Sequence, residues 1–342
     1  MSYSVRLEPI GVDMLVNEDE TVLQAAFRQG ITLMHGCKEG QCSSCKSVLL
    51  DGDAEHGDFS TFALSESEQS EGKVLLCRLY AQSDLEIELL NYDEEMLANW
   101  IPARNFTGTI CAIDSLTHDI RRFDVALNEP MSFHAGQFAE ITLPDSGVKR
   151  SYSMANPPQE TATLSFIIKI YPDGAFSDQL AHTLTVGDGV SIEGPFGTSF
   201  RNKNHHGPTL LVGGGSGMAP LWSILNDLVA SGGEHAVRLY YGARTAKDLF
   251  YLDAVAALGA KLKDFAFVPA LSEPAADDDW QGARGFIHEV LARDFADAAR
   301  DRTLEAYVCG PPPMVDAVLP VLQKIGVDAD NIHLDKFTPA TT

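Results

Sequence analysis

The sequence lacks the features that would place its 342 residues in a membrane or outside the cell. It contains no run of about 18 apolar residues, so no membrane-spanning helix is expected. No basic segment followed by an apolar one opens the chain. Six cysteines in a chain of this length do not indicate the disulfide framework of a secreted protein. We therefore expect a cytoplasmic protein that does not bind membranes.

Positive charge is also scarce. The chain has 25 Lys and Arg residues against 48 Asp and Glu, a formal net charge of −23. Residues 1–98 carry 19 of the acidic residues and only 6 of the basic ones. Because nucleic-acid phosphates would be repelled, nucleic acid is not an expected partner. The acidic region either steers a basic protein partner toward the chain or serves solubility alone, and both interpretations stay open.

The usual side-chain catalysts are missing as well. We find no Ser–His–Asp set, no pair of carboxylates suited to acid–base catalysis, and no His-x-x-x-His metal site. This absence favours a protein whose chemistry is carried by bound cofactors, with the chain supplying orientation and electrostatics.

Cysteines at one spacing stand out. Cys37, Cys42 and Cys45 form a C-x4-C-x2-C loop, and Cys77 follows after a further 31 residues. Three thiolates from one loop and a fourth from a distant segment are typical of a plant-type [2Fe–2S] cluster. A zinc site would need a second C-x2-C pair, and Rieske ligation would need paired histidines. His35, beside the loop, is expected at the surface.

The first hundred residues predict a small mixed sheet with one helix. Apolar and polar residues alternate over 3–8 and again over 85–89, as in half-buried strands. Residues 21–30 have helical spacing of apolar positions and end at a glycine. The segment 36–78 is similar to the ferredoxin domains of oxygenase reductases.

Residues 101–202 predict an antiparallel barrel of about six strands. Cys111 is expected to be a small core residue of one strand. Within residues 149–156, an arginine, an aromatic residue and a hydroxyl could serve a flavin by pairing with its pyrophosphate, stacking on its ring and reaching a ring nitrogen. The glycine turn at 173–177 opens a helix and could present N–H groups to a phosphate. Each motif alone is weak.

Residues 205–342 alternate strands and helices, which predicts a parallel sheet. The segment 209–220 predicts a strand, a glycine turn and a helix opened by Pro220. It departs from G-x-G-x-x-G because Met218 occupies the third glycine position, and the next strand ends at Arg244 instead of an acidic residue. An ordinary Rossmann dehydrogenase is therefore disfavoured.

The order of these motifs resembles the ferredoxin–NADP reductase superfamily. The match extends to Gly136-Gln-Phe, Gly194-Pro-Phe-Gly and the segment 307–314. The resemblance implies that Ser153 lies near the flavin N5 and Cys309 beside the nicotinamide, both as catalytic residues. The implied FAD-binding residues are Arg150, Tyr152, Ser153, Gly174 and Ser177, with Phe337 as a flavin neighbour. The implied coenzyme-binding residues are Gly214, Gly215, Ser216, Gly217, Pro220, Cys309 and Gly310.

The coenzyme is expected to be NADH. NADPH members of this superfamily often place an arginine after the serine that ends the third strand of the coenzyme domain, whereas Glu273 follows Ser272 here. Its charge would repel a 2′-phosphate. Arg244 argues for the opposite preference.

Taken whole, the chain resembles the reductase components of bacterial multicomponent oxygenases, especially those of soluble di-iron monooxygenases acting on phenol, toluene, methane or short alkanes. The resemblance implies a multidomain α+β and α/β protein. Residues 1–97 would form a β-grasp-like [2Fe–2S] ferredoxin domain, 98–203 a six-stranded antiparallel β-barrel FAD domain, and 204–342 a parallel-sheet NAD-binding α/β domain. Electrons would pass from NADH through FAD and the cluster to a di-iron hydroxylase that binds transiently to a monomer.

Two alternatives remain at this point. The same three modules occur in reductases of Rieske-type aromatic-ring dioxygenases. A protein of a different class, an electron carrier or a zinc-stabilised interaction module without enzymatic activity, would retain the motifs without using them.

Overall fold

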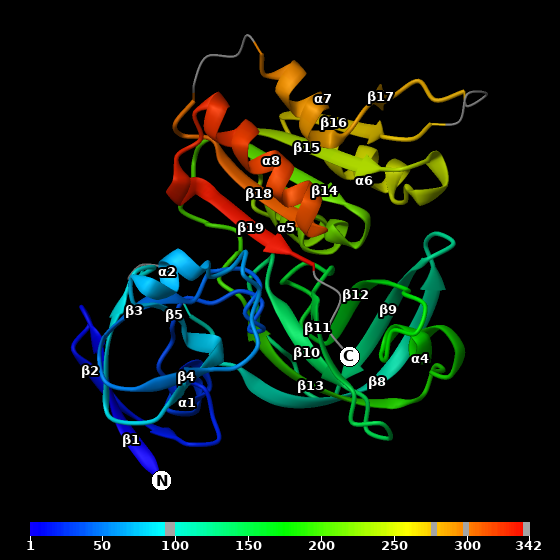
Figure 1. The fold of residues 1–342 in the computed structure, drawn as a ribbon. Helices are drawn as coiled ribbons and strands as arrows, with labels where there is room; N and C mark the ends of the chain where they lie inside the picture. The colour runs from blue at the N-terminus through cyan, green and yellow to red at the C-terminus, as the bar shows by residue number, and fades with distance from the viewer. Residues whose placement is uncertain (93–99, 275–278, 297–300, 338–342) are drawn as a thin grey trace. The chain divides into compact units, whose positions relative to one another are not determined.

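The computed structural model describes residues 1–92, 100–274, 279–296 and 301–337 (Figure 1). The chain divides into two compact units. Unit 1 comprises Met1–Ala103 together with Phe196–Thr198, and unit 2 comprises Arg104–Pro195 and Ser199–Thr342. The expected domain boundary between residues 97 and 98 lies outside the described residues.

Unit 1 is built on a five-stranded sheet. Its strands are β1 (Ser2–Glu8), β2 (Val12–Asn17), β3 (Lys46–Asp51), β5 (Lys73–Leu75) and β7 (Leu85–Leu89), with β4 (Ala54–His56) and β6 (Leu79–Ala81) in a small second sheet. Its helices are α1 (Val22–Arg28), α2 (Glu66–Ser70) and the 3₁₀ turn η1 (Leu76–Arg78). The strand order is β2-β1-β7-β3-β5, with β1 and β7 parallel and the other neighbouring pairs antiparallel.

The predicted periodicities explain this unit. Val5 and Leu7 on β1 are fully buried between more exposed neighbours, because successive side chains of a strand point to opposite faces. Helix α1 begins after Thr21, whose hydroxyl accepts from the N–H of Gln24 while the Gln24 side chain accepts from the N–H of Thr21. The small mixed sheet expected from the sequence is confirmed.

The first part of unit 2 is an antiparallel barrel. Its strands are β8 (Arg104–Ser115), β9 (Ile120–Leu127), β10 (Phe138–Thr142), β11 (Lys149–Ser153), β12 (Thr163–Lys169) and β13 (Gly189–Phe196), with the helix α4 (Ser177–His182). The order is β11-β10-β13-β8-β9-β12, and a bridge between Met154 and Phe166 joins the two ends. The predicted six-stranded barrel is confirmed.

The second part of unit 2 is a parallel sheet of six strands. They are β14 (Thr209–Gly214), β15 (Ala236–Ala243), β16 (Asp264–Leu271), β17 (Ala283–Arg284), β18 (Glu305–Gly310) and β19 (Ile332–Lys336), in the order β17-β16-β15-β14-β18-β19. The helices are α5 (Met218–Ala230), α6 (Leu252–Gly259), α7 (Ile287–Asp294) and α8 (Pro312–Ile325), with 3₁₀ turns η2 (Gly215–Gly217), η3 (Ala246–Asp248) and η4 (Ala329–Asn331).

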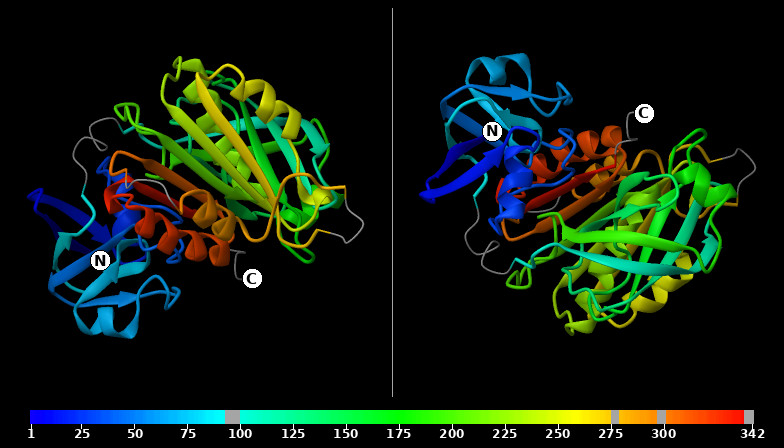
Figure 2. Two further views of the ribbon diagram at one scale, coloured as in Figure 1. Left: turned by 90° about the horizontal axis from the view of Figure 1, so that it is seen from above. Right: turned by 90° about the horizontal axis from the view of Figure 1, so that it is seen from below.

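Helices cover both faces of the parallel sheet (Figure 2). Leu211 on β14 packs in one core with α5 and α6, whereas its neighbours Leu210 and Val212 pack in another with α7 and α8. All six residues of β14 are buried, as expected of a central strand that is covered on both sides. This confirms the predicted α/β architecture.

The barrel and the parallel sheet share a core within unit 2. Barrel residues such as Ile120 and Ile167 belong to the same buried cluster as Met218 of α5. The buried hydroxyl of Ser223 on α5 donates to the carbonyl oxygen of Asn156, just after β11, at 2.8 Å. The end of β11 is thereby fixed against the elements that line the parallel sheet.

Candidate functional site

The loop that carries three cysteines is wound so that its N–H groups point at sulfur. Lys38 and Ser43 adopt left-handed backbone angles, with φ of 61° and 64°, which a residue other than glycine adopts only where its surroundings require it. The N–H groups of Glu39 and Gln41 donate to Sγ of Cys37 at 3.4 and 3.2 Å. Donors in this arrangement stabilise negative charge on sulfur.

All four cysteines of the predicted cluster lie together. The side chains of Cys37 and Cys42 hydrogen-bond, and so do those of Cys45 and Cys77. The hydrogen bond from Cys37 lowers the pKa of Cys42 although burial opposes this. The hydrogen bond to Cys45, then burial, raises the pKa of Cys77. Four soft donors that converge from one loop and one distant turn fit a [2Fe–2S] cluster.

Glycines in this loop leave no room for a larger residue. A Cβ at Gly36 would lie 2.8 Å from Sγ of Cys42 and 2.9 Å from the hydroxyl of Ser44. A Cβ at Gly40, where φ is 70°, would lie 2.7 Å from Cβ of Phe59. The cysteine loop therefore depends on small residues for its closure.

The expectation that His35 lies at the surface is wrong, because its side chain is completely buried in unit 1. Its Nδ1 lies 2.8 Å from the carbonyl oxygen of Leu33, and its Nε2 accepts from the N–H of Gly197 at 3.0 Å. The His35 carbonyl oxygen accepts from both the N–H and the hydroxyl of Thr198. These partners come from a segment more than 160 residues away, which no local pattern around His35 reveals.

Cys111 also differs from its expectation. The residue is on β8 as predicted, yet its side chain is exposed instead of being in the core. The pairing of β8 with β9 shifts register between Ile110 and Ala112, which marks a bulge at Cys111. The expectation rested on the frequent burial of small apolar residues such as free cysteine. On β8 the buried side chain is the preceding residue, Ile110, so Cys111 points to the opposite face.

Three predicted flavin-site residues lie on β11, the edge strand of the barrel sheet. Tyr152 packs against Phe176 with ring centroids 5.0 Å apart, and burial raises its pKa. Arg150 is half-buried, with one nitrogen donating to the carbonyl oxygen of Lys149 at 2.8 Å. Ser153 is buried at the end of the strand. An arginine, an aromatic ring and a hydroxyl within four residues of one strand fit a flavin and its pyrophosphate.

The predicted phosphate turn has a tight internal structure. The Ser177 hydroxyl accepts from the N–H of Tyr171 at 3.1 Å and faces its carbonyl oxygen at 3.3 Å. A Cβ at Gly174 would lie 2.3 Å from the same hydroxyl. Ser177 thus closes the turn, and Gly174 is the residue that permits the closure.

The glycine turn after β14 approaches the end of β18 closely. A Cβ at Gly217 would lie 2.0 Å from the carbonyl oxygen of Cys309, and one at Gly214 would lie 2.8 Å from Sδ of Met314. Gly215 has φ of 57° and open space around its Cβ position. The turn is therefore packed on one side and open on the other, as a turn that receives a pyrophosphate must be.

The remaining predicted coenzyme residues adjoin this turn. Ser216 is in η2, and Pro220 is in the first turn of α5, which begins two residues earlier at Met218. Gly310 has φ of 153° at the end of β18, and its carbonyl oxygen accepts from the N–H of Phe337 at 2.9 Å. The structure thus brings Phe337 beside the glycine turn.

A carboxylate that the sequence did not single out lies between the two expected catalytic residues. Asp335 on β19 is paired in register with Cys309 on β18, and its Oδ2 accepts from the hydroxyl of Ser153 at 3.3 Å. Burial, with the negative charge of Asp335, raises the pKa of the Cys309 thiol. A lone aspartate in a short C-terminal strand has no pattern that would mark it in advance.

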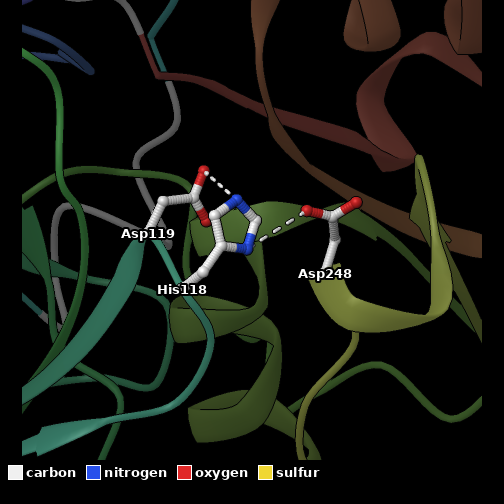
Figure 3. Close-up of side chains that lie close together, drawn as sticks. All are labelled: His118, Asp119 and Asp248. Carbon is white, nitrogen blue, oxygen red and sulfur yellow. Dashed lines mark ion pairs between the residues drawn. The ribbon is translucent and has the colours of Figure 1, made fainter.

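A cluster of charges joins the barrel to the turn after β15 (Figure 3). His118 lies 3.7 Å from Asp119 and 3.9 Å from Asp248. Lys169 pairs with Asp119 at 2.7 Å, and Arg244 lies 3.5 Å from Asp248 and 3.9 Å from Asp119. Two cations already neutralise the two carboxylates, so this is an ion-pair network and not a metal site.

The two residues that bear on coenzyme choice are adjacent. The N–H of Glu273 donates to the carbonyl oxygen of Arg244 at 2.8 Å, so both follow neighbouring strands at the carboxyl edge of the sheet. Both residues are exposed, and the guanidinium of Arg244 lies near the carboxylates described above. Within the described residues, no helix is long and apolar enough to cross a membrane.

Three domain families match the chain in succession. Residues 5–82 match the 2Fe-2S iron-sulfur cluster binding domain, residues 107–200 the oxidoreductase FAD-binding domain, and residues 211–319 the oxidoreductase NAD-binding domain. The chain thus carries domains for a [2Fe–2S] cluster, FAD and a nicotinamide coenzyme.

Relatives match over nearly the whole chain. The reductase component of propane 2-monooxygenase from Gordonia sp. (strain TY-5) is 45% identical over 98% of this chain and 97% of its own length. The phenol 2-monooxygenase reductase component DmpP from Pseudomonas sp. (strain CF600) is 34% identical over 99% and 96%. The crystal structure of the Amycolatopsis cytochrome P450 reductase GcoB is similar with a TM-score of 0.85, 31% identity, and coverage of 99% and 100%.

Proposed function

The chain belongs to the reductase components of multicomponent monooxygenases, and from that premise we propose that it delivers electrons from NADH to the di-iron hydroxylase of a short-alkane monooxygenase. The single observation that carries the choice of partner is the identity of 45% with a propane 2-monooxygenase reductase, against 34% with a phenol 2-monooxygenase reductase, at similar coverage.

The cysteine geometry supports one set of cluster ligands. We assign Cys37, Cys42, Cys45 and Cys77 as the four thiolates, because they converge and because N–H groups of the loop point at sulfur. Because two of them, Cys45 and Cys77, are buried, they would keep water from a bound cluster on that side. Such N–H donors raise the potential at which the cluster accepts an electron.

Residues of unit 2 would hold the flavin and the coenzyme. The chemistry that a bound FAD would supply is the conversion of a hydride from the coenzyme into single electrons for the cluster. Arg150, Tyr152 and Ser153 would bind the flavin, with Gly174 and Ser177 shaping the turn near its pyrophosphate. The coenzyme would lie on the residues assigned above around the glycine turn, namely Gly214, Gly215, Ser216, Gly217, Pro220, Cys309 and Gly310, with Phe337 next to the flavin.

The contribution of the chain itself to hydride transfer is to orient one side chain, that of Ser153. The hydroxyl of Ser153 donates a hydrogen bond to Asp335, which fixes the direction of that hydroxyl at the end of β11. Cys309 stays a neutral thiol because burial and the nearby carboxylate disfavour its thiolate, raising its pKa. A neutral, buried surface of this kind excludes water from the reacting atoms.

The charges support NADH over NADPH. Arg244 would be the cation for a 2′-phosphate, yet its guanidinium already faces Asp248 and Asp119. Glu273, beside it, is exposed and negative. A 2′-phosphate placed at this edge would meet the carboxylate of Glu273 and would compete with two other carboxylates for the guanidinium of Arg244.

The proposed organisation is a cytoplasmic monomer with domains at residues 1–97, 98–203 and 204–342. The three matched families fall one in each span, which supports this division. Size-exclusion chromatography with light scattering tests the monomer, for which a mass near 37.1 kDa plus cofactors is expected.

Reconstitution tests the partner. The purified holoprotein is combined with the remaining components of a propane 2-monooxygenase or of a phenol 2-monooxygenase, and NADH consumption is compared with product formation. We expect coupled turnover with the propane system and a rate at least tenfold lower with the phenol system. Coupling to the phenol components alone would overturn the choice of partner.

A further inference from the structure

An aromatic side chain stands in solvent close to the cysteine loop. Phe62 is 90% exposed, the highest value for any large hydrophobic side chain in the described part of the chain. Its backbone is nevertheless held in a fixed turn. The N–H groups of Ala63 and Leu64 both donate to the carbonyl oxygen of Ser60, and Ala63 and Leu64 are themselves buried. The phenyl ring is thus presented by a well-anchored turn.

The turn at 60–64 is bonded directly to the cysteine loop. The N–H of Ser60 donates to the carbonyl oxygen of Gly40 at 3.0 Å. The hydroxyl of Ser43 donates to the carbonyl oxygen of Ala63 at 2.9 Å. Because Phe62 lies between these two attachments, its position is set by the loop that carries the first three cysteines.

Further exposed apolar residues adjoin the next position of the loop. Asn91 donates from its side chain to the carbonyl oxygen of Ser44 at 3.2 Å. Its neighbours Leu90 and Tyr92 are 46% and 38% exposed. Three of the nine large hydrophobic side chains exposed in the described residues therefore flank segments bonded to the cysteine loop at its two serines. Scattered single exposures need no explanation, but this grouping around one loop does.

Acidic residues precede and follow the same turn. Helix α2 begins at Glu66, shortly after Phe62 in the chain, and carries Glu68 in the same first turn. Asp58 precedes the turn and is exposed. Lys46, which contacts this helix, is already paired with Glu68 at 2.6 Å. A partner that fits this surface offers an apolar pocket with a basic rim.

We propose that Phe62, with Leu90 and Tyr92, is the apolar anchor by which the monooxygenase hydroxylase docks over the cysteine loop. The proposal rests on the proposed function and deepens it. Electron transfer requires the partner to come close to the cluster, and an aromatic anchor that becomes buried within a charged rim provides such contact. The acidic rim accelerates encounter and orients the partner, and the ring fixes the docked position.

The test compares Phe62→Ala with Leu15→Ala in the holoprotein. Leu15 is 55% exposed on β2, the strand at the opposite edge of the five-stranded sheet from β5, which leads to Cys77. Three activities are measured with NADH: reduction of ferricyanide, reduction of cytochrome c, and coupled turnover with the hydroxylase of a propane 2-monooxygenase at varied reductase concentration. Phe62→Leu serves as the conservative variant.

We expect Phe62→Ala to leave the first two activities unchanged and to raise the reductase concentration for half-maximal coupled turnover about tenfold. Leu15→Ala should match the unmodified protein throughout, and Phe62→Leu should recover most of the loss. Unchanged coupled turnover in Phe62→Ala would overturn the proposal. An equal loss in cytochrome c reduction would also overturn it, because the ring would then serve transfer within the chain. If the unmodified protein itself fails to drive the hydroxylase, the proposed function fails, and the docking proposal fails with it.

Discussion

The hydroxyl of Ser153 donates to the carboxylate of Asp335 at 3.3 Å, and this contact joins the edge strand of the barrel to the last strand of the parallel sheet. Cys309 is paired in register with Asp335 on the neighbouring strand. Three side chains from three distant segments thus meet where the proposed flavin and coenzyme sites adjoin, which makes this contact the natural place to perturb hydride transfer.

Asp335→Asn should slow flavin reduction by NADH about tenfold to a hundredfold, because Ser153 loses its charged acceptor and with it a fixed orientation. Stopped-flow absorbance under anaerobic conditions measures the rate. Asp316→Asn is the matched control, since Asp316 pairs at 2.7 Å with Lys336, the next residue of the same strand. Equal rates in the two variants would contradict an orienting role for Asp335.

Cys309 should resist alkylation at about pH 8. Burial and the carboxylate of Asp335 both raise the pKa of its thiol, so the reactive thiolate is scarcer at any given pH than in an ordinary cysteine. Mass spectrometry after iodoacetamide treatment of the folded protein should find Cys111 modified and Cys309 unmodified. Both should react in guanidinium chloride. Comparable labelling of the two thiols in the folded protein would disprove the prediction.

Gly217→Ala should weaken NADH binding at least tenfold or prevent folding of the parallel sheet, because its Cβ would lie 2.0 Å from the carbonyl oxygen of Cys309. Fluorescence titration with NADH and thermal unfolding separate the two outcomes. Gly189→Ala is the control, since the nearest atom to its Cβ position is 4.0 Å away. An unaffected Gly217→Ala protein would show that the turn can relax.

Glu273→Arg should raise kcat/KM for NADPH by about tenfold or more, since a negative charge is replaced by a cation beside the already paired Arg244. The value for NADH should change less than threefold. Steady-state ferricyanide reduction with each coenzyme provides the comparison, and Glu273→Gln shows how much of the effect comes from removing charge alone. If kcat/KM for NADPH did not rise, the 2′-phosphate of the coenzyme would bind away from residue 273.

The sequence predicted those features whose signals lie within one stretch of the chain. The spacing of Cys37, Cys42 and Cys45 is a property of one loop, so the cluster could be inferred before any fold was known. The order of three module types follows from periodicity over long windows. The packing of Gly217 against Cys309 was not predicted, because the two residues are far apart in the chain and the resemblance implied only that each binds the coenzyme.

The sequence did not predict the features that arise from tertiary contacts. His35 hydrogen-bonds to Gly197 and Thr198, more than 160 residues away, and packs against the rings of Phe27 and Trp100. The residues next to it in sequence gave no sign of these contacts. Asp335 acquires its partner through the pairing of β18 with β19. Cys111 was assigned to the core as a small apolar residue, but it follows the buried Ile110 on β8 and therefore points to the other face.

Unit 1 consists of two separate segments of the chain, Met1–Ala103 and the tripeptide Phe196–Thr198. A fragment ending at residue 103 would leave the Nε2 atom and the carbonyl oxygen of His35 without Gly197 and Thr198. Gene fusion and recombination usually exchange contiguous modules, yet this one includes a tripeptide encoded far downstream of the rest. A chimera that borrows the ferredoxin module from a relative must therefore match this tripeptide as well, or the transplanted histidine will face a foreign sequence.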